Sequence, residues 1–144
     1  FDLAEGDSIT ALAGVSGNSL VSGTEKGGLW MITLDATANA HKEVSNDANE
    51  TISTTSSPRI LIVASPQKAI RDPDGTAIRH VAYDSMEESV YAVLSTKGLL
   101  RCSLRSSGPC TFYASDPINP IKSIAVDSWN GFLYMINSNK DVYQ

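Results

Sequence analysis

Residues 121–143, which read IKSIAVDSWNGFLYMINSNKDVY, decide the fold because the same pattern occurs upstream. A shift of 43 residues places the segment that begins at Ile78 on the one that begins at Ile121 without a gap. A fainter third copy begins at Ile9. The chain is therefore built of repeats with a period in the low forties. The two clear copies share these identities: Ile78/Ile121, Ala82/Ala125, Asp84/Asp127, Ser85/Ser128, Tyr91/Tyr134, Ser95/Ser138 and Lys97/Lys140.

Each copy has the pattern of an antiparallel β-meander. A short apolar strand (IRHVAYD or IKSIAVD) ends at a polar turn, and an almost continuously apolar run follows (VYAVL or FLYMI). A lysine-containing turn and a third strand come next. The apolar second strands predict sheets that are covered on both faces. Strand repeats of this length, stacked face to face, are typical of β-propeller blades.

We therefore predict an all-β fold in which antiparallel four-stranded blades form a partial arc of a β-propeller. The first blade covers residues 1–34, the second covers residues 78–115, and a third begins within residues 116–144. About three blades are too few to close a ring, since propellers typically have four to eight. We expect the chain to be the interior of something longer and to pack against the rest of its own propeller.

Two segments separate the first and second blades. Residues 35–58 are polar and almost free of large apolar side chains, which predicts a disordered insertion. Residues 59–77 begin with the apolar run RILIVAS, the expected outer strand of the first blade, and continue as the connection to the second. Within the insertion, Asn49 begins an Asn-Glu-Thr triplet, the acceptor pattern for an N-linked glycan in a secreted protein.

The two cysteines predict a disulfide. Cys102 and Cys110 lie on the two arms of one predicted hairpin, joined by SLRSSGP, at positions that face each other across the strands. Directly opposed, non-hydrogen-bonded strand pairs have the spacing that a disulfide accepts. The alternative is two buried free thiols of a cytosolic protein. The facing positions and the glycan triplet favour an oxidising compartment.

Composition and motifs exclude several classes of function. The chain has 144 residues, a net charge of −5 and no basic patch, so we expect no nucleic-acid partner. No run of eighteen apolar residues occurs, so we expect no direct membrane contact in this segment. Neither His41 nor His80 has a second ligand at zinc spacing, and no phosphate loop or Gly-x-Ser-x-Gly motif occurs. We expect no catalytic site, metal or cofactor in this fragment.

Three positions of the repeat carry site predictions. Because Asp84 and Asp127 recur at equivalent turns, we expect each to tie its own turn to the backbone rather than to form a catalytic carboxylate pair. Trp129 lies in the turn after Asp127 and is a candidate binding aromatic. A tryptophan at this point more often packs back on the sheet that it caps, which is the favoured interpretation.

The two clear copies, HVAYDSMEESVYAVLSTKG and SIAVDSWNGFLYMINSNKD, resemble the YWTD-type propellers of the low-density-lipoprotein-receptor family and of the Sevenless and Ros receptor tyrosine kinases. Asp84 and Asp127 match the aspartate that ends the first strand in those families, and Trp129 matches the aromatic after it. Tyr91 and Tyr134 match the tyrosine of the signature. The tryptophan, threonine and final aspartate of the signature are missing, which favours a Sevenless-like relative.

The resemblance implies a six-bladed propeller on the extracellular side of the plasma membrane, as part of a larger membrane protein. It implies an extracellular protein ligand, bound by loops on one face of the propeller. It also implies a tyrosine kinase domain elsewhere in the full-length chain. The alternatives are a fragment of a secreted propeller enzyme and an intracellular scaffold propeller.

Overall fold

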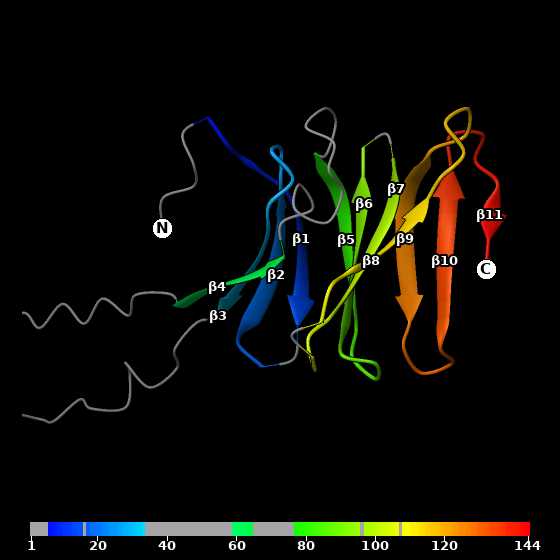
Figure 1. Cartoon of the computed structure of the whole chain (residues 1–144). Coiled ribbons are helices and arrows are strands. Elements are labelled where there is room, and N and C mark those ends of the chain that lie inside the picture. The colour runs from blue at the N-terminus through cyan, green and yellow to red at the C-terminus, as the bar shows by residue number, and fades with distance from the viewer. Residues whose placement is uncertain (1–5, 16, 34–58, 65–76, 96, 107) are drawn as a thin grey trace, which may run out of the picture.

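The computed structural model describes residues 6–15, 17–33, 59–64, 77–95, 97–106 and 108–144. Its regular structure in these residues is β-strand throughout, with no helix, arranged as three antiparallel sheets (Figure 1). The all-β, antiparallel prediction is therefore confirmed. The predicted insertion at 35–58, with His41 and Asn49, and most of the connection within 59–77 lie outside the described residues.

Each sheet is a meander of consecutive strands. Sheet 1 contains β1 (Ile9–Val15), β2 (Ser19–Thr24), β3 (Leu29–Thr33) and β4 (Arg59–Ala64). Sheet 2 contains β5 (Ile78–Asp84), β6 (Ser89–Leu94), β7 (Gly98–Ser103) and β8 (Thr111–Ala114). Sheet 3 contains β9 (Ile121–Asp127), β10 (Phe132–Asn137) and β11 (Val142–Tyr143). The strand at 59–64 pairs with β3, as predicted for an outer strand.

The three sheets share one irregularity, which identifies them as repeats of structure as well as of sequence. In each sheet, the pairing of the first strand with the second skips one residue directly after the first pair. The skipped residues are Thr10, Arg79 and Lys122. A bulge of this kind bends its strand and increases the local twist. Equivalent residues of sheets 2 and 3 are consequently 43 positions apart along the whole first hairpin.

Sheet 2 lies between the other two sheets and is covered on both faces. The larger core fills the space between sheets 1 and 2, and a smaller one lies between sheets 2 and 3. This arrangement explains why β6 is apolar almost without interruption. The buried residues of the larger core are Val21, Leu29, Ile78, Val81, Val90, Ala92, Leu94, Leu100 and Cys102. Those of the smaller core are Val93, Leu99 and Ile124, with Leu133 and Met135 packed against them.

The first strands of the sheets lie side by side, with β5 between β1 and β9. The hydroxyl of Thr10 lies within hydrogen-bond distance of the carbonyl oxygens of Gly23 and Ile78, which links sheets 1 and 2. On the other side, Nδ1 of His80 accepts a hydrogen bond from the backbone N–H of Ile124 at 3.0 Å. A Cβ at Gly23 would lie 2.2 Å from Cγ2 of Ile78. Sheet 2 therefore approaches the backbone of β2 too closely for any side chain at Gly23.

We expect Gly23→Ala to lower the free energy of unfolding by about 1–3 kcal/mol, because the added methyl group forces β2 and Ile78 apart. Gly108→Ala is the matched control, since its Cβ would meet nothing closer than Ser106 Oγ at 3.5 Å. The control should change the free energy of unfolding by no more than about 0.5 kcal/mol. Urea denaturation followed by tryptophan fluorescence measures both. Equal effects would contradict the close packing of sheets 1 and 2.

Candidate protein-interaction surface

The turns that join the first and second strands of sheets 2 and 3 lie at the same end of the molecule (Figure 1). We call this the first-turn end. The β5–β6 turn covers residues 85–88, and the β9–β10 turn covers residues 128–131. The backbone N–H of Ser85 donates a hydrogen bond to Oγ of Ser128 at 3.1 Å. The two turns are therefore directly connected at this end of the molecule.

Each turn is fastened by the aspartate that precedes it. Oδ1 of Asp84 accepts hydrogen bonds from the backbone N–H groups of Met86 at 3.0 Å and Glu87 at 3.2 Å. Oδ1 of Asp127 accepts from the backbone N–H of Asn130 at 3.1 Å, and Oδ2 accepts from its side-chain amide at 2.7 Å. These contacts match the turn-fastening role predicted for the two aspartates.

The two turns display apolar side chains to solvent. Trp129 is 87% exposed, and Met86, which lies 43 positions earlier at the equivalent place, is 57% exposed. The interpretation that Trp129 packs back on its sheet is therefore wrong. The reason is local, because the N–H of Gly131 bonds to the carbonyl of Asp127 at 2.9 Å and closes a tight turn with Trp129 at its tip. We call the two turns with these side chains the Met86–Trp129 surface.

The connection between β7 and β8, residues 104–110, supports the Met86 turn from the side. The N–H of Leu104 donates to the carbonyl of Glu88 at 2.7 Å. Nη2 of Arg105 donates to the carbonyl of Met86 at 2.9 Å, and Nε of Arg105 lies 3.4 Å from the Glu88 carboxylate. The sequence did not single out Arg105 or Met86. For Met86, the sequence offered one indication, because the equivalent position 43 residues later is Trp129. For Arg105, the repeat offered no such indication.

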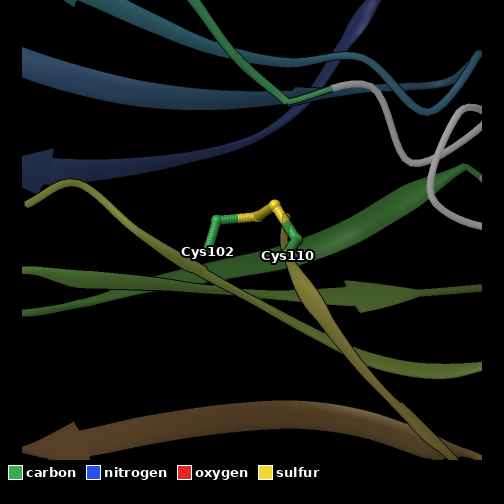
Figure 2. Close-up of a disulfide and its surroundings, with 2 residues drawn as sticks. All are labelled: Cys102 and Cys110. Atoms are coloured by element: carbon green, nitrogen blue, oxygen red, sulfur yellow. A yellow bond between two sulfur atoms is a disulfide. The ribbon is translucent and has the colours of Figure 1, made fainter. Parts of the chain in front are cut away.

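Cys102 and Cys110 form a disulfide, with their Cα atoms 4.4 Å apart. This distance is that of a directly opposed, non-hydrogen-bonded strand pair, the arrangement predicted from their facing positions. Figure 2 shows the bond on the face of sheet 2 that is turned toward sheet 1. The bond closes the connection that carries Arg105 and fixes the start of β8, whose four side chains are all exposed.

The two repeat tyrosines lie away from this surface, at equivalent places in β6 and β10. Tyr91 packs against the core between sheets 2 and 3, and this burial raises the pKa of its phenol. The guanidinium of Arg101 lies 5.8 Å from the centre of the Tyr91 ring. Tyr134 is half-buried, and its ring meets that of Phe132 edge-on at 6.2 Å. Both tyrosines therefore contribute to side-chain packing on the sheets rather than to the Met86–Trp129 surface.

The described residues also bear on two other kinds of site. Among the residues that the structure describes, no three His, Cys, Asp or Glu side chains are grouped so that they could hold a metal ion. The same residues include no helix of the length and apolarity that a membrane crossing needs. Asn49 lies outside them, so its glycan stays a prediction.

The chain is similar to Protein roller-3 of Caenorhabditis briggsae, with 31% identity over 150 residues. The similarity covers 100% of this chain and 5% of roller-3, so the chain spans about a twentieth of the length of this curated relative. No protein-family model matches the chain. No solved structure matches it.

The pKa of Asp127 is below the ordinary value of an aspartate, because the side-chain amide and the backbone N–H of Asn130 both stabilise the ionised carboxylate. A lowered folded-state pKa stabilises the turn at pH values above the unfolded pKa, and this contribution is lost as the pH falls through the folded pKa. We expect Asn130→Ala to raise the pKa of Asp127 toward the ordinary value. NMR titration of the Asp127 side-chain carboxyl carbon, in the variant and in the wild type, measures this change. An unchanged pKa of Asp127 in the variant would rule out the side-chain amide of Asn130 as the cause of the lowered pKa.

Proposed function

We propose that this chain is an arc of a larger β-propeller in the extracellular region of a cell-surface receptor, and that it binds a protein ligand through the Met86–Trp129 surface. The observation that carries the binding proposal is the exposure of Trp129 and Met86 on two fastened turns that the hydrogen bond from Ser85 to Ser128 joins. Tryptophan is among the side chains most enriched at the centres of protein interfaces. Fastened turns also lose little conformational freedom on binding, which favours affinity.

The open face of sheet 3 supports the propeller arc. In sheet 2, Val93 and Leu99 stand opposite each other on β6 and β7 and are buried against sheet 3. Their equivalents in sheet 3, 43 residues later, are Ile136 and Val142, which also stand opposite each other. These two side chains are 41% and 66% exposed. A further sheet, stacked on sheet 3 as sheet 3 is stacked on sheet 2, would cover them.

The outer face of sheet 1 supports continuation in the other direction. Leu12 and Leu20 lie on that face and are exposed. In the strand registers, Leu12 and Leu20 occupy the places that Val81 and Val90 occupy in sheet 2. Both valines are buried against sheet 1. Each outer sheet thus presents the apolar positions that sheet 2 buries, which is the pattern expected of successive propeller blades. The six-bladed YWTD-type propellers, which the repeats resemble, have this architecture.

The extracellular and receptor parts of the proposal have separate support. The Cys102–Cys110 disulfide favours an oxidising compartment and disfavours an intracellular scaffold. The repeat sequences resemble the ectodomain propellers of the Sevenless and Ros receptors, which have a tyrosine kinase domain elsewhere in the chain. The proposed protein is therefore a Sevenless-like receptor, and this chain is one part of its ligand-binding region.

The arc can be tested with a charge on the open face of sheet 3. In the full-length protein, Ile136→Asp should lower the folded yield sharply, because a further sheet would bury the unpaired carboxylate at a cost of several kcal/mol. Ile118→Asp is the control, since Ile118 is 83% exposed in the β8–β9 connection. Secretion level and resistance to limited proteolysis are measured for both. Normal secretion of Ile136→Asp would mean that nothing covers this face and would refute the arc.

The binding function can be tested with live cells of the source organism. The full-length extracellular region, fused to an antibody Fc, should stain a subset of cells in a manner that protease treatment of the cells abolishes. Trp129→Ala should weaken staining by about 30-fold or more, as expected for an interface residue worth at least about 2 kcal/mol. Ile118→Ala removes an equally exposed apolar side chain at the opposite end and should stain normally. Equal staining by Trp129→Ala and the wild type would exclude this surface.

A further inference from the structure

We propose that Arg105 and the Cys102–Cys110 disulfide are positioning elements of the binding surface. They hold the turn that carries Met86, so that Met86 enters an apolar pocket of the protein partner together with Trp129. They thereby set the affinity for the partner by positioning the Met86 turn. They are not themselves the main contacts with the partner. This inference rests on the proposed function, because it assigns a role within the same surface.

The first step is that the backbone of Met86 is held on both sides. Its N–H donates to Asp84 at 3.0 Å, and its carbonyl accepts from Arg105 at 2.9 Å. The methionine side chain is unbranched and flexible, so the direction in which it leaves the surface depends on the backbone that carries it. Fixing that backbone before binding reduces the conformational entropy lost when the partner binds.

The second step is that Arg105 is itself held by the β7–β8 connection. Its backbone N–H donates to Oγ of Ser103 at 3.2 Å, and the connection is closed by the disulfide. Its guanidinium uses Nη2 for the Met86 carbonyl and Nε for the Glu88 carboxylate. The planar fork of arginine allows both contacts at once, whereas the single ammonium of lysine does not reproduce this geometry.

The third step is that the Trp129 half of the surface has its own support. Asp127 fastens that turn through Asn130, and the Gly131 N–H closes it. The bond from Ser85 to Ser128 joins the two halves. The contacts that Leu104 and Arg105 make with the two turns go to Met86 and Glu88. We therefore expect the β7–β8 connection to act mainly on the Met86 half, with the Trp129 half as an internal control.

Hydrogen exchange in the full-length protein tests the positioning role without any ligand. Arg105→Ala and the double variant Cys102→Ala/Cys110→Ala should each speed exchange at the Met86 and Glu87 amides by about tenfold, while the Asn130 amide stays unchanged. Arg105→Lys should lie between Arg105→Ala and the wild type. Unchanged exchange at Met86 and Glu87 in Arg105→Ala would overturn the inference. An equal rise at Asn130 would also overturn it, since it would indicate general loosening.

Binding to live cells then tests the role in affinity. Arg105→Ala should weaken staining by about five- to tenfold, and it should weaken staining no further when it is added to Met86→Ala, because Arg105 acts through Met86. Adding Trp129→Ala to Arg105→Ala should weaken staining further. If the losses of staining caused by Arg105→Ala and Met86→Ala were additive in the double variant, the inference would be overturned. Absence of staining by the wild type would refute the proposed function instead, and the exchange rates would still decide whether Arg105 positions the turn.

Discussion

The burial of sheet 2 on both faces is the constraint on which the rest of the structure depends. A sheet that is apolar on both sides is stable only between two neighbours, and here it has sheet 1 on one side and sheet 3 on the other. The absence of a side chain at Gly23 lets Ile78 approach the backbone of β2. His80 accepts a hydrogen bond from Ile124 on the other side. Apolar packing supplies the attraction, and these polar and steric contacts fix the relative position of the sheets.

The first-turn end follows from this stacking. Because sheets 2 and 3 have the same bulge and the same strand lengths in their first hairpins, their first turns end at the same level. The bond from Ser85 to Ser128 joins positions that are 43 residues apart, which are equivalent in the two repeats. The aspartate that closes each turn is common to both, whereas the residue at the tip is Met86 in one and Trp129 in the other. The repeat therefore maintains the scaffold while the tips vary.

The sequence predicted the sheets, their order and the disulfide well, because those features follow from apolar periodicity and from positions opposite each other on one hairpin. It predicted the role of Asp84 and Asp127 for the same reason, since an aspartate before a short turn finds its partners within three residues. The exposure of Trp129 was the less favoured interpretation, because the sequence does not show that the turn from Asp127 to Gly131 closes with Trp129 at its tip. The support from Arg105 was missed because its partner Met86 lies 19 residues away.

The difference between scaffold and tip also explains why so little of the proposed binding surface is periodic. Tyr91 and Ala82 pack against the core between sheets 2 and 3, and the same residue types recur 43 positions later as Tyr134 and Ala125. A turn tip has no such neighbour, so the packing of the sheets does not constrain its side chain. Exposed apolar side chains at two adjacent tips add nothing to the packing of sheets 2 and 3, since neither contributes to the core between them. The packing of the fold therefore does not account for these two exposed side chains, and the proposed protein partner would account for them.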